Sequence, residues 1–397
     1  MASTTIARAL TIGILLSCAA FGAYGTFGAG VGNGLFEALQ RSAGYEAKEK
    51  GFLGGPTPYK TTYTGIRLID NHLVVLNAFF VLIIDGPKTW DVTIAYWCLM
   101  AEFCAAWVFI RIEGHRSANQ HGRIVNWTGT FGVLIQNITF TVTTPIYFII
   151  YLLTSPAARS NPTPDDLAVN YGDTELLPHR TALSFIIPAA LMSLPSPSVL
   201  SAGAHYTWLS IWQIFPVAHT FYHFLHWFGY GLLVQVALPG DILESKRKDR
   251  DALIRAQRFA LYLCSIPRAL AMAVALTPAA LAPEALRPVF EQVTLGSLLV
   301  PYWPWNSPVG GDPASPAGKA ELAKLFLQWD VACGGLAILA WASFVYLVAV
   351  PNKGLLRDVV PKVLTYGLVG GPVAAATVLV MERDTAVLGP SAKGKKE

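Results

Sequence analysis

The sequence predicts an all-α protein, a polytopic transmembrane helical bundle that forms a single domain over residues 1–397. Of these residues 53% are hydrophobic and only 14% are charged, whereas soluble domains carry about a quarter charged residues. Apolar runs continue from the N-terminus nearly to residue 381. The five cysteines include no CxxC pair, so neither a disulfide framework nor a zinc site is expected.

About eight apolar runs approach the roughly twenty residues that a spanning helix requires. The first resembles the hydrophobic region of a signal peptide, but no persuasive cleavage site follows it. It is therefore interpreted as a retained helix, with a cleaved signal as the alternative. The shorter segment Thr181–Leu194 contains Pro188, which favours a re-entrant or interfacial position. The expected spans are Ile6–Ala29, Ile66–Ile84, Val92–Ile110, Ile124–Leu153, Tyr206–Leu238, Phe259–Leu281, Phe326–Val350 and Val363–Met381.

The distribution of basic residues predicts an orientation. If the short segment does not cross, the most basic loops share one side, which the positive-inside rule assigns to the cytosol. These loops are 30–66, 111–123, 245–258 and 351–362. Both termini and the long loops 154–204 and 282–325 would then face the lumen, and residues 382–397 would form a flexible tail. No basic stripe occurs away from the apolar spans, so nucleic-acid binding is not expected.

Two carboxyl groups within apolar runs are predicted to be catalytic. Asp70 lies one turn inside the second run, where it either forms a boundary ion pair with Arg67 or takes part in chemistry. Glu102 lies near the centre of the third run, with no basic residue within a turn. Burial would keep it protonated, which is the state a general acid needs. Alternatively, a neutral Glu102 bonds a neighbouring helix. Asp330 is interpreted as a boundary residue.

A histidine- and aromatic-rich run covers residues 205–230. His219, His223 and His226 recur at i, i+4 and i+7, which places them on one helical face. They are compatible with part of a di-iron histidine set, with haem ligation that includes His205, or with a pocket in which histidines move protons. Packed histidines among interfacial aromatics are the structural alternative. The remaining histidines supply no second box of matching spacing.

The predicted site combines these groups, without a metal or cofactor. Asp70, Glu102, His219 and His223 are the predicted catalytic residues, and polar or aromatic side chains are expected to bind the substrate. The predicted substrate-binding residues are Asn77, Trp97, Asn137, Trp212, Tyr222, His226 and Trp227.

Absent motifs narrow the chemistry. The sequence has no GxxxxGK[ST] loop, no GxSxG elbow, no HExxH pair and no paired DxxxD clusters for a magnesium diphosphate. Buried acids in an aromatic pocket suit proton-initiated cyclisation of a lipophilic polyene. The acid protonates an epoxide or alkene, aromatic faces stabilise the cation, and water is excluded. The alternatives are a metal-dependent membrane oxidase or hydroxylase that uses the histidine-rich helix, and a non-enzymatic transporter.

One stretch carries a family resemblance. Tyr63-Thr64-Gly65-Ile66, Ile69-Asp70 and Leu76-Asn77-Ala78-Phe79-Phe80 resemble the "YTGI…LD…L…FF" opening of fungal integral membrane proteins from terpenoid gene clusters. That family includes the membrane terpene cyclases of the ascofuranone and ascochlorin pathways and related proteins of indole-diterpene clusters. The resemblance implies metal-independent cyclisation of an epoxidised farnesyl chain on an aromatic polyketide, in the endoplasmic reticulum membrane. The expected partners are a lipophilic prenylated small molecule and the lipid bilayer. Asp70 is the one candidate acid that lies within the motif. No oligomeric state is predicted.

Overall fold

The structure is a computed structural model that describes residues 2–42, 59–85, 89–120, 122–234, 242–305 and 315–389. Within these ranges every regular element is a helix and no strand occurs, which confirms the predicted all-α bundle. Six helices in the described chain are long and apolar enough to cross a membrane, against the eight expected. They are Thr4–Gly32, Arg67–Ile84, Trp90–Gly114, Lys248–Leu276, Ala317–Ala349 and Leu355–Leu388.

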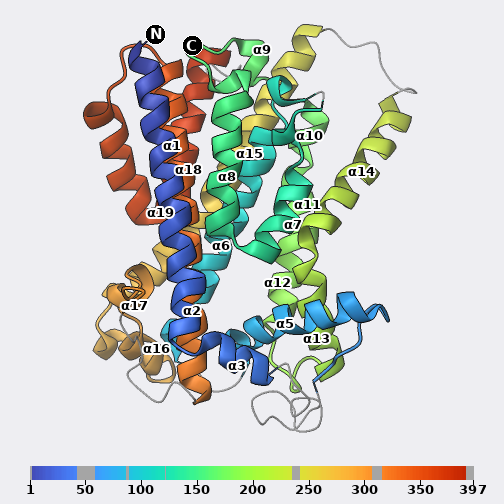
Figure 1. The fold of residues 1–397 in the computed structure, drawn as a ribbon, viewed down its shortest axis with the longest axis vertical. Helices are drawn as coiled ribbons and strands as arrows, with labels where there is room; N and C mark the ends of the chain where they lie inside the picture. The colour runs from blue at the N-terminus through green and yellow to red at the C-terminus, as the bar shows by residue number, and fades with distance from the viewer. Residues whose placement is uncertain are drawn as a thin grey trace.

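The long helices run along the longest dimension of the molecule (Figure 1). These are α1 (Ala2–Ala23), α6 (Trp90–Gly114), α15 (Ile242–Leu276) and α18 (Pro316–Ala349). The N-terminus and the last described residues lie at the same end, which we call the terminal end, and the opposite end is the distal end (Figure 1). α1 leads from the terminal to the distal end, and α6 returns.

Contacts between segments far apart in the sequence show which segments meet at each end of the bundle. At the terminal end, Arg8 donates to the carbonyl of Ala158 at 2.9 Å, and Arg116 pairs with Asp384 at 2.6 Å. At the distal end, Lys324 pairs with Asp91 at 2.7 Å. Shorter helices complete the framework: α2 (Ala29–Gly32), α3 (Leu35–Ser42), α9 (Pro164–Leu167), α10 (Tyr171–Glu175), α16 (Arg287–Gln292) and α17 (Leu295–Leu299).

The fourth expected span is a re-entrant hairpin. It consists of α7 (Thr128–Ile138) and α8 (Phe140–Thr154), which are joined at Thr139, where φ is +124°. Arg123 donates to the carbonyl of Thr154 at 2.8 Å, so the hairpin begins and ends at the terminal end. The prediction of a single crossing over residues 124–153 is therefore wrong. Hydropathy cannot distinguish the two cases, because a helix broken inside a protein bundle can be as apolar as a continuous one.

The last helix is a second re-entrant hairpin. α19 (Val360–Leu388) follows the short π-helix Leu355–Val359 and is broken at Gly371, where φ is +79°. Lys362 and Glu382 form an ion pair at 3.2 Å, whereas a straight helix would separate them by about 30 Å. The two halves are therefore antiparallel, and their tip lies inside the bundle. The predicted span Val363–Met381 does not cross as one helix.

The second expected span, α5 (Arg67–Ile84), lies across the distal end beside α13 (Ala202–Gln213) (Figure 1). The fifth expected span is divided into α13 and α14 (Phe215–Val234). The break at Ile214 precedes Pro216, which lacks a backbone N–H to continue the ladder. Hydropathy thus identified the residues of these helices, but it did not predict how the helices are oriented in the bundle.

The two long regions that were expected to face the same side of the membrane lie at different ends of the bundle. The region 154–204 is largely helical, with α11 (Leu177–Thr181), a π-helix (Ala182–Ile186) and α12 (Ile187–Met192) leading from the terminal end towards α13. It begins at the terminal end, whereas residues 282–305 lie at the distal end, where Gln292 accepts from the backbone of Trp90 at 2.8 Å. The two long regions therefore do not share one face of the bundle.

The expected flexible tail is in part helical. Residues 382–388 belong to α19, where Arg383 is fully buried and pairs with Glu113 at 3.0 Å. This ion pair fixes the end of the helix to α6. Residues 390–397 lie outside the described residues.

Candidate functional site

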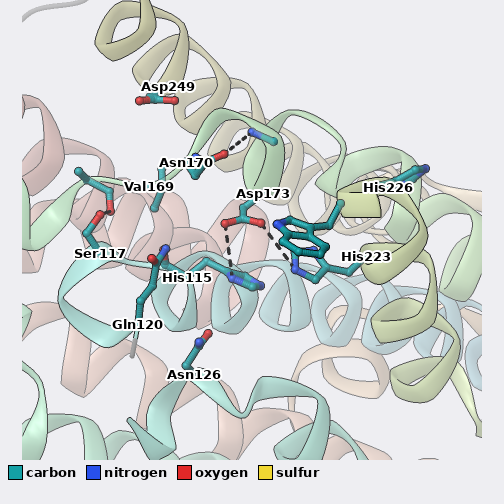
Figure 2. A pocket seen from close by; sticks show the side chains of 13 residues that line it. His115, Ser117, Gln120, Asn126, Val169, Asn170, Asp173, His223, His226 and Asp249 are labelled. Carbon is teal, nitrogen blue, oxygen red and sulfur yellow. Dashed lines mark hydrogen bonds and ion pairs between the residues drawn. The ribbon is translucent and has the colours of Figure 1, made fainter. Parts of the chain in front are cut away.

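A polar pocket of about 630 Å³ opens near the terminal end (Figure 2). This volume suits a small-molecule ligand. Its walls come from the end of α6, the loop after it, α10, α14 and α15. The lining residues are His115, Ser117, Gln120, Asn126, Ala168, Val169, Asn170, Gly172, Asp173, His223, His226, Trp227 and Asp249.

Three ionisable side chains meet in this pocket. The Asp173 carboxylate lies 3.9 Å from Nδ1 of His115 and 3.6 Å from Nε2 of His223 (Figure 2). The two imidazole rings are 4.9 Å apart between centroids. His115 ends α6, and Asp173 lies in the first turn of α10, which Asn170 caps by accepting from the N–H of Gly172 at 2.8 Å. The cap holds α10, and therefore Asp173, in place.

Burial and nearby charge act in opposite directions on Asp173. Burial raises the pKa of this carboxyl above its ordinary value, although the positive charges of Arg180 and Arg111 oppose the shift. Burial likewise lowers the pKa of His115 well below its ordinary value, and Arg111 lowers it further. The pocket therefore brings together a carboxyl group and imidazoles, which are groups that general acid–base catalysis uses.

Arg180 determines which ring nitrogen of His223 carries the proton. Its guanidinium is fully buried, contacts Nδ1 of His223 and donates to the backbone carbonyl of Asp173. Because a guanidinium only donates, Nδ1 of His223 must accept, and the ring proton is assigned to Nε2. Nε2 is the nitrogen that faces Asp173. Sequence reasoning missed Arg180, His115 and Asp173, since nothing local distinguishes Asp173 from the other acids of its loop.

An aromatic layer lies beneath the polar pocket. His219 is fully buried, and its Nδ1 accepts from Nε1 of Trp107 at 3.3 Å. Phe215 packs edge-to-face against Trp107 with centroids 5.2 Å apart, and against Phe185 at 4.8 Å. The predicted residue Trp212 belongs to the same cluster, 5.4 Å from Phe185. His219 thus lies behind the pocket and does not line it.

The other predicted residues are dispersed. His226 and Trp227 line the polar pocket together with His223, but Tyr222 lines none of the pockets described here. Trp97 lines a separate apolar pocket of about 390 Å³ between α6, α12 and α15. At the distal side of the bundle, Asn77 donates to Ser210 at 2.7 Å and Asn137 contacts His72 at 2.5 Å.

Asp70 has a structural role in the family-like motif. Its carboxylate accepts the backbone N–H groups of Tyr63 at 3.2 Å, Thr64 at 2.7 Å and Gly65 at 3.1 Å, as well as the Thr64 hydroxyl at 2.8 Å. Four donors of this kind favour the ionised carboxylate. The contacts explain why Asp70 follows the YTG sequence, because the side chain holds that turn against the start of α5.

Glu102 lies in the centre of the bundle, away from the polar pocket. The structure brings Arg268 of α15 within 3.3 Å of its carboxylate, a partner that the local sequence could not reveal. The N–H of Val373 points at the same carboxylate from 3.5 Å, just past the tip of the α19 hairpin. The carboxylate therefore caps the second half of α19.

The pocket also has the donor types of a metal site. Ligand atoms of His115, Asp173 and His223 lie within 4.8 Å of one another, and two imidazoles with one carboxylate suit zinc or iron. Arg180, however, occupies one nitrogen of His223, and a buried guanidinium repels a cation. Among the predicted His219, His223 and His226, only His223 joins this group.

Comparison with known proteins places this arrangement in a family. The model of the CtvD domain family matches residues 11–388. This chain belongs to that family. Among curated proteins, the chain is 25% identical to the terpene cyclase ascI of Acremonium egyptiacum over 83% of this chain and 81% of that protein. It is 22% identical to the terpene cyclase janA of Penicillium janthinellum over 93% of each chain.

A third relative, the terpene cyclase verU1 of Penicillium polonicum, is 26% identical over 78% of this chain and 76% of its own length. No solved structure matches the chain. The resemblance to a fungal terpene cyclase family that the sequence predicted is thus confirmed.

Proposed function

We propose that this CtvD-family protein is a membrane-embedded terpene cyclase, which protonates an epoxide or alkene of a prenylated aromatic substrate and closes rings through a carbocation. Its relatives carry the name terpene cyclase. The observation that carries the mechanism is the Asp173 carboxyl, which lies between His115 and His223 in a pocket large enough for a substrate.

We assign the proton donor to Asp173 rather than to the two acids predicted from sequence, because only Asp173 lines the polar pocket. Asp70 accepts four hydrogen bonds that favour its charged form, and Glu102 is paired with Arg268. Neither lines the polar pocket, whereas the side chain of Asp173 does. Burial also raises its pKa, and a general acid works best when it is protonated near the working pH.

The reaction we propose is an isomerisation. Asp173 transfers its proton to the epoxide oxygen, the adjacent C–O bond breaks, and an alkene of the same chain attacks the electron-poor carbon. The aromatic layer beneath the pocket, with Trp107 and Phe215 at its centre, stabilises the cation and excludes water. The final cation loses a proton to the Asp173 carboxylate or to His115. The substrate and product therefore have the same mass.

The long apolar helices indicate where the proposed reaction takes place. We propose that the helices that run the length of the bundle, among them α1, α6, α15 and α18, cross the endoplasmic reticulum membrane, where a lipophilic substrate concentrates. Proton transfer from a carboxylic acid needs no metal or other cofactor. A prenylated aromatic molecule could place its polar ring in the pocket and its chain against the aromatic layer.

The test is conversion of an epoxidised prenyl phenol by microsomes that contain the protein. Wild-type protein should give a product of unchanged mass and shifted retention time without added metal or nucleotide. Asp173→Asn should lower kcat by about 10²- to 10⁴-fold, because general acid catalysis contributes that much. Glu175→Gln is the matched control, since Glu175 lies on the same helix but pairs with Arg255. Full turnover by Asp173→Asn would exclude Asp173 as the donor.

A metal-dependent oxidase is the second candidate, favoured by the ligand spacing of His115, Asp173 and His223. Purified protein with stoichiometric iron, and a product heavier by one oxygen atom, would support it. A product of unchanged mass that resists chelators would remove it.

A transporter is the third candidate, favoured by the two broken-helix hairpins, since broken helices form substrate sites in transporters. Movement of the substrate across liposomes without chemical change would support this function over the cyclase.

A further inference from the structure

Arg111 is a buried cation without an acidic partner among the described residues. It lies in the last turn of α6 and is 3% exposed. One guanidinium nitrogen donates to the Thr128 hydroxyl at 2.5 Å, and the group lies over the ring of Trp107 at 5.9 Å. Its Nε and Nη2 atoms have no hydrogen-bond partner in the described structure. Two donors of a buried charge are therefore unsatisfied.

Arg180 adds a second positive charge nearby. It is fully buried, and its donors meet only neutral groups, namely His223 and the backbone carbonyl of Asp173, while Nε has no partner in the described chain. Glu113 does not compensate either guanidinium, because Arg116 and Arg383 already pair with it at 2.7 Å and 3.0 Å. Among the described residues, Asp173 is then the one carboxyl group that acts on both cations, and the proposed mechanism requires it to be protonated.

Both guanidinium groups belong to residues next to the lining of the polar pocket, although neither arginine is itself a lining residue. Arg111 precedes His115 by one turn on the same face of α6. Its partner Thr128 follows Asn126 by two residues, and both His115 and Asn126 line the pocket (Figure 2). Arg180 touches His223, which lines the same pocket from α14. A ligand that fills the pocket therefore contacts residues that adjoin both guanidinium groups.

Unpaired buried charges are strongly destabilising, so such a cluster calls for a counter-charge. We propose that the pocket binds an anionic oxygen group of the substrate, a carboxylate on its aromatic part, which pairs with Arg111 and Arg180. This inference rests on the proposed cyclase function and deepens it by naming the class of substrate. The phosphate of an anionic lipid has the same chemistry and is the competing source of the anion.

The test uses the full-length protein in phosphatidylcholine nanodiscs. The probes are a benzoic acid that bears an epoxidised farnesyl chain and its methyl ester. We expect the acid to bind about 10- to 100-fold more tightly, because a hydrogen bond to a charged group contributes that much affinity. Arg111→Gln should remove the difference, and Arg111→Lys should retain part of it. Arg255→Gln, an exposed cation near the same pocket, should leave it unchanged.

Equal affinity of the acid and the ester in wild-type protein would overturn the inference, whether or not the variants fold. Nanodiscs with phosphatidic acid provide the second arm. Loss of acid binding in them, with phosphatidic acid stabilising wild-type protein but not Arg111→Gln, would assign the site to a lipid and also overturn it. Arginine-dependent binding of the acid without a cyclic product would keep the anion site and refute the cyclase. Equal affinity for the two probes together with cyclisation of both would support the cyclase and refute the anion site.

Discussion

The carboxylate of Asp330 on α18 accepts a hydrogen bond at 2.8 Å from the backbone N–H of Thr141, in the first turn of α8. It thereby caps the returning half of the first re-entrant hairpin. Glu102 on α6 has the equivalent role for the second hairpin, where it faces the N–H of Val373. In each case a carboxylate from a long helix meets the exposed N–H groups and positive dipole of a half-helix inside the bundle. The two hairpins are thus held by the same device.

Removal of one cap should destabilise the bundle. Asp330→Ala is expected to lower the free energy of unfolding by about 1–2 kcal/mol, since loss of a helix N-cap has that effect. Asp330→Asn should retain most of the stability, because the amide oxygen can still accept from Thr141. Thermal unfolding of the purified protein in detergent measures the difference. The control is Glu284→Gln, an exposed acid at the distal end. An unchanged Tm for Asp330→Ala would show that the cap contributes nothing.

The tip of the α19 hairpin requires glycine. Gly371 has φ +79° and ψ +179°, and a Cβ there would lie 2.4 Å from Oε1 of Glu102. Gly371→Ala should therefore lower stability by about 1–3 kcal/mol through backbone strain alone, and should also displace Glu102. Gly367→Ala, in the same helix with its nearest side-chain atom at 3.9 Å, should be neutral or stabilising by up to about 1 kcal/mol. Thermal unfolding should give opposite signs for the pair, and equal shifts would contradict this account.

The two re-entrant hairpins predict a specific topology. Ser160 lies in the region beside the N-terminal helix, whereas Glu284 lies in the region at the opposite end of the bundle. Cysteines introduced as Ser160→Cys and Glu284→Cys should therefore react with a membrane-impermeant maleimide from opposite sides of sealed microsomes. The native protein is the control, since all five native cysteines are buried or half-buried. Labelling of both positions from one side would restore the orientation expected from charge alone.

The activity should depend on the protonation of Asp173. Because its pKa is raised by burial and the protonated form is active, kcat/KM should be high at low pH and fall as the pH rises through that pKa. His115 should stay neutral across this range, since its pKa lies well below the ordinary 6.5. Arg180 lowers the pKa of Asp173, so Arg180→Gln should move the descending limb to higher pH.

The pH–rate profile of cyclisation in detergent tests this. Arg255→Gln, which changes an exposed charge, should leave the limb in place. A profile in Arg180→Gln that moves to lower pH would have the wrong sign and would contradict the assignment.

Sequence reasoning located most of the helices and few of the contacts. The runs that became α1, α6, α15 and α18 were recognised because length and hydropathy are local properties. The same criteria treated residues 124–153 as a single span, since a hairpin broken at Thr139 has the composition of one. Asp330, interpreted as a boundary residue, caps a buried half-helix instead. Of the predicted site, His223, His226 and Trp227 line the polar pocket.

By itself, the sequence determined that this is an apolar all-helical bundle with an aromatic interior, because an apolar segment must satisfy its own backbone hydrogen bonds and helices do so locally. Which polar groups meet depends on how the helices pack. Arg268 reached Glu102, and Asp173 joined His115 and His223, through the packing of segments far apart in the chain. Burial and charge at those meeting points arise from every neighbouring helix at once, so no local pattern could have predicted them.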